Sequence, residues 1–94
     1  SLNNLGALLQ AMGDLAGARP YFERALTIRE NVLGLDHPDT AQSIWWIGTL
    51  LERTGDKEAA RTHLERAVSI YQRALGPTHP TTRQCQRALD QLNA

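Results

Sequence analysis

The chain has 94 residues, in which ten Lys or Arg residues are balanced by ten Asp or Glu residues, so its formal net charge at pH 7 is zero. A neutral chain lacks the electrostatic attraction that draws proteins to nucleic acid or to anionic membranes, and we expect neither as a partner. Its uncharged runs are shorter than the roughly 18 residues that a membrane-spanning helix needs. The single cysteine cannot form an internal disulfide, which favours the cytoplasm over an oxidising compartment.

An internal repeat organises the sequence. When residues 1–42 are aligned with residues 43–84, 18 of the 42 pairs are identical, far more than chance produces. A period between about 20 and 50 residues is typical of stacked supersecondary units, none of which buries its apolar face alone. The sequence therefore predicts an array of such units.

The first repeat begins with two predicted helices, residues 1–12 and 15–33. The apolar residues of the first helix stand at helical spacing: Leu2, Leu5, Leu9 and Met12. Between the helices, Gly13 suits a left-handed helix end and Asp14 suits a cap for the next helix, so we expect a tight turn and antiparallel helices. Pro20 lies near the start of the second helix, where we expect a local kink rather than a break.

The second repeat follows the same plan. Gly34 ends the preceding helix, and His37-Pro38 starts a new one, with proline at a position where a missing N–H does no harm. The predicted helices of this repeat span residues 39–54 and 57–75. The equivalent His79-Pro80 precedes a fifth helix at 81–92, which has no second helix to pair with and is predicted to be a cap. We expect both histidines to fix their turns by hydrogen bonding or packing.

Glycine recurs inside the first helix of each repeat, at Gly6 and Gly48. A glycine within a helix costs about 1 kcal/mol relative to alanine, so a helix that keeps one needs the space. We therefore expect both glycines to mark places where two helices approach closely.

The chain resembles the tetratricopeptide repeat family. The matching positions are Leu2, Leu5-Gly6, Leu9, Ala18, Phe22 and Ala25, and again Ile44, Ile47-Gly48, Leu51, Ala60, Leu64 and Ala67. The segments 2–5, 23–28 and 33–40 further resemble the 42-residue variety found in kinesin light chains and in large bacterial signalling proteins.

The resemblance implies an all-α fold, a right-handed superhelical solenoid of antiparallel helix pairs. It implies one domain over residues 1–94, with a repeat at 1–42, a repeat at 43–80 and a capping helix at 81–92. We also expect the chain to be an excerpt of a longer array.

The resemblance also implies a protein-interaction scaffold, in which the first helix of each unit lines a concave groove that binds a peptide. On a helical wheel, Trp46 points about 150° away from the apolar stripe of its helix and Trp45 about 110°, so we expect Trp46 to face the groove and Trp45 to fill space between helices. Padding between helices remains the alternative for Trp46, and a position facing the groove remains the alternative for Trp45. The candidate peptide-binding residues are Asn3, Asn4, Ala7, Trp45, Trp46, Thr49, Arg53 and Arg87.

Each kind of candidate residue has an expected part in peptide binding. Asn3 and Asn4 are expected to hold the peptide backbone. Trp46 is expected to cover an apolar side chain, and Arg53 or Arg87 to meet an acidic one.

No catalytic, metal or cofactor site is predicted, and we expect the chain not to be an enzyme. His37 and His79 lie one repeat apart and cannot share a metal ion. Cys85 has no histidine or carboxylate at ligand or triad spacing, so we expect it to be a small buried hydrophobe. No glycine-rich phosphate loop is present.

A second hypothesis makes the chain a structural spacer or self-association module of a larger signalling or regulatory protein. Leu8 and Met12 lie beside or outside the apolar stripe of helix 1–12, which carries no charged residue. An exposed apolar patch tends to bind another protein surface. Self-association through helix 1–12 is therefore predicted.

Overall fold

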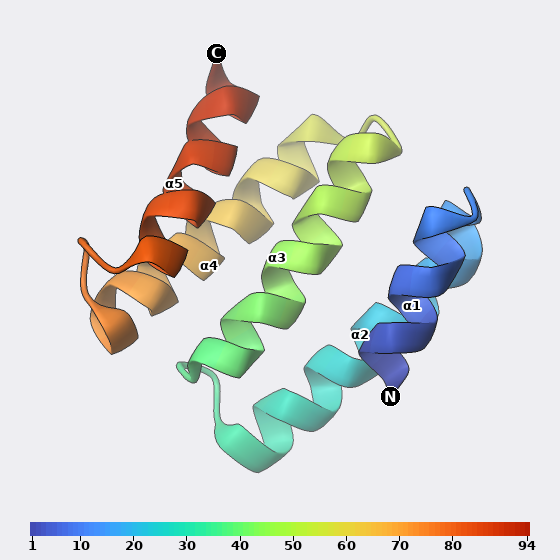
Figure 1. Ribbon diagram of the computed structural model, residues 1–94, viewed down its shortest axis with the longest axis horizontal. Helices are drawn as coiled ribbons and strands as arrows, with labels where there is room; N and C mark the ends of the chain where they lie inside the picture. Colours follow the sequence, from blue (N-terminus) through green and yellow to red (C-terminus); the bar gives the residue numbers. More distant parts are fainter.

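The computed structural model describes all 94 residues as five α-helices without a strand (Figure 1). The helices are α1 (Leu2–Ala11), α2 (Leu15–Leu33), α3 (Pro38–Arg53), α4 (Lys57–Leu75) and α5 (Pro80–Asn93). Each helix packs on the next one along the chain, so that α3 lies between the α1–α2 pair and the α4–α5 pair. The predicted all-α helical repeat fold is confirmed, and every predicted helix is found to within one residue at either end.

The short turns inside the two helix pairs have the conformation that the Gly-Asp sequence predicts. Gly13 and Gly55 have φ angles of 87° and 92°, in the left-handed region that glycine enters without steric cost. The carboxylate of Asp14 accepts a hydrogen bond from the Gly17 N–H at 2.9 Å, and Asp56 caps α4 in the same way. Local sequence is therefore sufficient to form both turns.

The turns between repeats are capped by histidine. Nδ1 of His37 accepts the N–H of Asp39 at 3.0 Å, and Nδ1 of His79 accepts the N–H of Thr81 at 3.1 Å. Each bond satisfies an N–H in the first turn of a helix, where the chain has no carbonyl to pair with it. The prediction that the histidines fix these turns is confirmed.

Close helix packing depends on the two helical glycines. A Cβ atom at Gly6 would lie 2.7 Å from Cε1 of Phe22 on α2, closer than carbon atoms pack. A Cβ atom at Gly48 would lie 3.3 Å from Cβ of His63 and Cγ of Leu64 on α4. Both glycines therefore occupy helix contacts, as predicted.

Two details of the helices differ from the expectations or refine them. α2 continues through Pro20 without a break.

In α1, Leu5 is 46% exposed although it belongs to the predicted apolar stripe, and the buried residues are Asn3 and Gly6. The residue equivalent to Leu5 in the second repeat, Ile47, is buried because α2 packs against α3. No helix covers the corresponding side of α1.

The outer face of α5 is polar. The positions that correspond to the buried Ile44, Gly48 and Leu51 of α3 are occupied by Gln86, Asp90 and Asn93. Gln86 donates to Asp90 Oδ1 at 2.9 Å, and Arg61 on α4 donates to Asn93 Oδ1 at 2.7 Å. A polar outer face is what a capping helix needs, and that role stays a prediction for α5. None of the five helices combines the length and hydropathy needed to cross a membrane.

Candidate functional site

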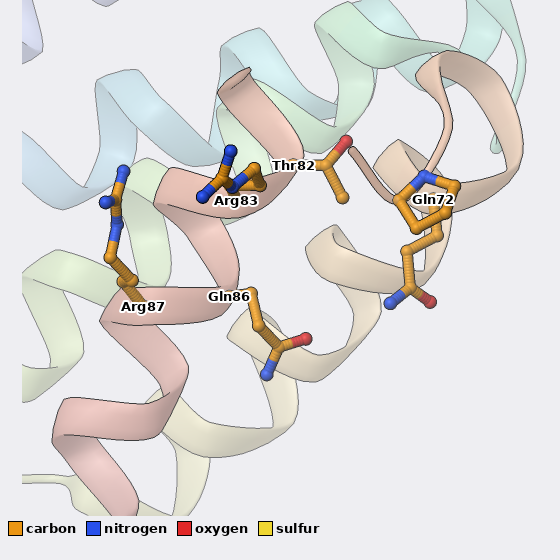
Figure 2. Close-up of a pocket in the computed structure, with 6 residues that line it drawn as sticks. Gln72, Thr82, Arg83, Gln86 and Arg87 are labelled. Carbon is orange, nitrogen blue, oxygen red and sulfur yellow. The ribbon is translucent and has the colours of Figure 1, made fainter. Parts of the chain in front are cut away.

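A polar cavity of about 220 Å³ lies between the end of α4 and the start of α5 (Figure 2). We call it the arginine cavity, and its lining residues are Gln72, Pro77, Thr82, Arg83, Gln86 and Arg87. Arg83 and Arg87 extend from the same side of α5, and neither forms an ion pair. Arg87, a predicted groove residue, therefore belongs to this cavity.

A larger cavity, of about 430 Å³, is formed by α3, α4 and α5. We call it the aromatic cavity, and its lining residues are Gln42, Trp45, Trp46, Thr49, Tyr71, Thr81 and Gln84. It shares no residue with the arginine cavity, and none of its lining residues carries a formal charge at neutral pH. Three of the eight predicted groove residues, Trp45, Trp46 and Thr49, come together here.

The two tryptophans are held by aromatic contacts with two different helices. Trp45 meets Tyr71 of α4 edge to face, with ring centroids 6.1 Å apart. Trp46 packs on Phe22 of α2, with ring centroids 5.7 Å apart and the ring planes 51° apart. Such pairs favour these geometries because the edge of one ring carries positive charge and the face of the other negative charge.

The expected contrast between the two tryptophans is not found. Both are half-buried, both pack against the hydrophobic core and both line the aromatic cavity. The helical wheel placed Trp46 outside the core because it takes no account of Phe22, which reaches the indole from the neighbouring helix. The cavity wall is thus pre-organised by contacts with α2 and α4.

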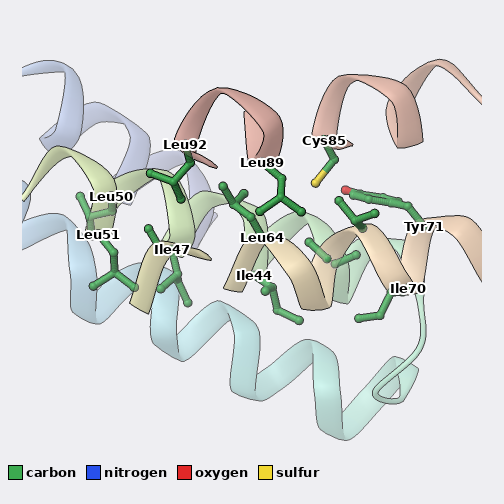
Figure 3. Packing of buried hydrophobic residues seen from close by; sticks show 14 of the residues in the cluster. Ile44, Ile47, Leu50, Leu51, Leu64, Ile70, Tyr71, Cys85, Leu89 and Leu92 are labelled. Carbon is green, nitrogen blue, oxygen red and sulfur yellow. The ribbon is translucent and has the colours of Figure 1, made fainter. Parts of the chain in front are cut away.

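Tyr71 supplies a buried polar group to the same cavity. Its side chain is only 3% exposed and lies beneath α5 beside Cys85 (Figure 3). Burial, with smaller effects from Cys85 and Asp39, raises the pKa of Tyr71 to about 12, so the hydroxyl stays protonated at neutral pH. The hydroxyl has no hydrogen-bond partner within the chain, which leaves its O–H available to an acceptor in the cavity.

The amide of Gln42 is oriented by Arg29 of α2. Nη1 of Arg29 donates to Gln42 Oε1 at 3.1 Å, and also to Ser43 Oγ and to the carbonyl of Asp39. Because the Gln42 oxygen is occupied, its amide N–H groups remain as donors at the cavity wall. Arg29 is half-buried and forms no ion pair, so it places an unneutralised positive charge beside the aromatic cavity.

The remaining predicted groove residues lie elsewhere. Asn4 and Ala7 are exposed on α1, and Arg53 is exposed at the end of α3. Asn3 is 93% buried between α1 and α2, and its Oδ1 is enclosed without a hydrogen-bond partner. The structure therefore does not bring the asparagine pair and the tryptophan pair into one cavity.

Sequence reasoning missed Arg29, Gln42, Tyr71, Thr81 and Gln84. A signal for some of them was present in the repeat alignment. Tyr71 replaces Arg29 at equivalent positions, and Gln42 and Gln84 are identical partners one repeat apart. The alignment does not single these positions out among the other matches and substitutions, and only the packing of α3, α4 and α5 shows that they meet.

The structure contains no group of three His, Cys, Asp or Glu side chains that could hold a metal ion. Cys85 is fully buried, and burial raises its pKa to about 12, so its thiol stays protonated and unreactive. Its prediction as a small buried residue is confirmed. The site thus offers aromatic faces and hydrogen-bond donors, which are the means of binding a partner.

Comparison with known families supports the repeat architecture. A family model described as tetratricopeptide repeat matches residues 1–73 and, a second time, residues 43–92. The two matches begin 42 residues apart, which is the offset of the internal repeat. Comparison with curated proteins gives no match.

Proposed function

Because the chain belongs to the tetratricopeptide repeat family, whose repeats generally mediate protein–protein interactions, we propose that it is a scaffold that binds a partner peptide in the aromatic cavity. We further propose that it is of the kinesin-light-chain-like variety, which the 42-residue period supports, and that it works in the cytoplasm, in keeping with a single cysteine that has no partner for an internal disulfide.

One observation carries the proposal. Three aromatic side chains from two helices, Trp45, Trp46 and Tyr71, line a single cavity, and their indole N–H groups and hydroxyl have no hydrogen-bond partner within the chain. Aromatic residues that are held rigidly and keep a free N–H or O–H are the groups that most often dominate binding interfaces. In a protein that does not bind a partner at this surface, we would expect other side chains to cover the two indoles.

We also propose that the partner carries an acidic residue next to the bound segment, and Arg29 supports this. Three of its neighbours accept hydrogen bonds from Nη1, but none of them is a carboxylate. Arg53 and Arg87, for which this part was predicted, do not line the aromatic cavity. A contact of Arg53 or Arg87 with an acidic residue of the partner stays a prediction.

The test is selection of peptides from a random displayed library, followed by fluorescence titration of the enriched peptides. Gln84→Ala is the informative variant, because Gln84 is exposed and lines the cavity without packing in the core. We expect it to weaken binding several-fold, in the range of about 0.5–1.5 kcal/mol for one lost hydrogen bond. Gln91→Ala, on the same helix and outside the cavity, is the matched control and should bind as the original chain does.

Trp46→Ala should weaken binding more, by about 1–3 kcal/mol, as expected of an aromatic anchor. Its effect on folding is measured separately by thermal unfolding, because Trp46 also packs on Phe22. Enriched peptides that bind the original chain, Gln84→Ala and Trp46→Ala equally well would contradict binding in this cavity.

A specific observation also favours the second candidate function, self-association. The exposed fractions of Leu5 and Leu8 on α1 and of Met12 at its C-terminal end are 46%, 56% and 71%, and α1 has no charged side chain. An uncharged apolar helix face can pair with a second copy of itself without like-charge repulsion. This surface lies apart from the aromatic cavity, so the two functions are compatible.

A further inference from the structure

We propose that the aromatic cavity accepts a proline-rich segment in the polyproline II conformation. This inference rests on the proposed binding function and names the chemical class of the partner. It follows from the donors, the size and the charge of the cavity.

The aromatic wall of the cavity offers hydrogen-bond donors, whereas Thr81 and Gln84 on the α5 side carry acceptor oxygens as well. The indole N–H groups of Trp45 and Trp46 and the hydroxyl of Tyr71 have no partners within the chain, and Arg29 leaves only the N–H groups of Gln42 free. A ligand that matches such a wall presents carbonyl oxygens without competing N–H groups. Proline-rich chains do so, since proline lacks a backbone N–H and a polyproline II helix has no internal hydrogen bonds.

The size of the cavity fits a short extended segment. A volume of about 430 Å³ accommodates about three residues, which is one turn of a polyproline II helix. An α-helix is about 10–12 Å across with its side chains and rises 5.4 Å per turn, so a single turn occupies about 500 Å³, more than the volume of the cavity. Addition of a peptide β-strand is excluded because the all-α chain has no sheet edge.

The charge distribution argues against charged ligands in the cavity itself. Aromatic rings attract cations, but the cavity has no carboxylate and the guanidinium of Arg29 lies beside it. An anion would face the negative faces of the rings without a positively charged group in the lining. A neutral, apolar ligand rich in carbonyl groups is the remaining class.

Proline also suits the aromatic wall energetically. The compact pyrrolidine ring packs against an indole face, and aromatic-lined grooves bind proline-rich segments in other domains. Because the polyproline II helix is already formed in the free peptide, binding loses little conformational entropy. The fixed positions of Trp45 and Trp46, held by Tyr71 and Phe22, limit the corresponding loss on the side of the protein.

The experiment is titration of the ¹⁵N-labelled chain with a capped peptide of eight prolines, observed by NMR. The two tryptophan side chains give two indole N–H resonances, which Trp45→Phe assigns. We expect both resonances to shift downfield in a saturable way as the indoles donate to carbonyl groups. A capped glycine-serine peptide of the same length is the comparison, and we expect it to bind at least about ten-fold more weakly.

Gln84→Ala and its control Gln91→Ala extend the test. We expect Gln84→Ala to weaken binding of the proline peptide while the spectrum of the free chain stays folded. Equal binding of the two peptides, or no shift of either indole resonance, would overturn the proline inference. If peptides without proline, selected from the library, still bind in the aromatic cavity, the scaffold function stands and only the partner class is wrong. If no peptide of either kind binds there, both proposals fail.

Discussion

Replacement of Gly48 tests how closely α3 and α4 pack. A methyl group at this position would lie 3.3 Å from Cβ of His63 and Cγ of Leu64, so Gly48→Ala requires shifts of only a few tenths of an ångström. Alanine also gains about 1 kcal/mol of helix propensity over glycine. Since the two effects oppose each other, we expect Gly48→Ala to change the free energy of unfolding little.

Gly48→Leu should behave differently. Leucine gains nearly the same helix propensity, but its three further carbon atoms must enter a contact that is already tight. Overpacking of this kind typically costs about 1–3 kcal/mol, and we expect a net loss of stability in that range. For a domain of this size, each kcal/mol corresponds to a fall of about 4–8 °C in Tm.

Thermal and urea unfolding, followed by circular dichroism, measure the change. Ala7→Leu, at an exposed position on α1, is the control for adding the same kind of side chain without a helix contact. Gly6→Ala gives an internal comparison, because its Cβ would lie 2.7 Å from Phe22 and should cost more than Gly48→Ala does. A Gly48→Leu chain that melts at the same temperature as the original, or higher, would refute the close-approach argument.

Two further predictions concern the buried thiol and the exposed face of α1. Burial raises the pKa of Cys85 from an ordinary value near 9 to about 12, so only the unfolded chain ionises its thiol in that interval. The free energy of unfolding should therefore fall above pH 9 by up to about 1.4 kcal/mol per pH unit from this residue, with a further contribution from Tyr71 above pH 10. Denaturant titrations at pH 8, 9 and 10 measure the slope, and Cys85→Ala should flatten it between pH 9 and 10; an unchanged slope would contradict the assignment. Self-association through α1 predicts a concentration-dependent mass in sedimentation that Leu8→Glu abolishes, whereas Val32→Glu, at an exposed site on α2, leaves it unchanged. A chain that stays a 10.4 kDa monomer at high concentration would exclude that surface.

The helices, turns and caps of this protein are determined by its sequence, because they depend on interactions between residues that are near one another in the chain. The turn at Gly13 and Asp14 depends on residues that lie within five positions of one another in the chain. His37 caps a helix that starts at the next residue. The 42-residue repeat adds the stacking of units, since two copies of one helix pair bury equivalent faces.

Tertiary packing determines which side chains line the aromatic cavity. A helical wheel gives the direction of a side chain from its own helix, but not which neighbour meets it. Phe22 on α2 and Tyr71 on α4 place the two tryptophans in one wall, a result that the angles of Trp45 and Trp46 alone did not predict.

The same reason explains the exposure of α1 and the position of Arg29. Leu5 and Ile47 occupy equivalent positions with similar side chains, yet only Ile47 is buried, because burial depends on the helix that packs against the residue. Arg29 meets Gln42 thirteen residues away, across the turn between repeats. Local sequence thus determines the elements of this fold, whereas contacts between helices determine which of its side chains are left free to bind.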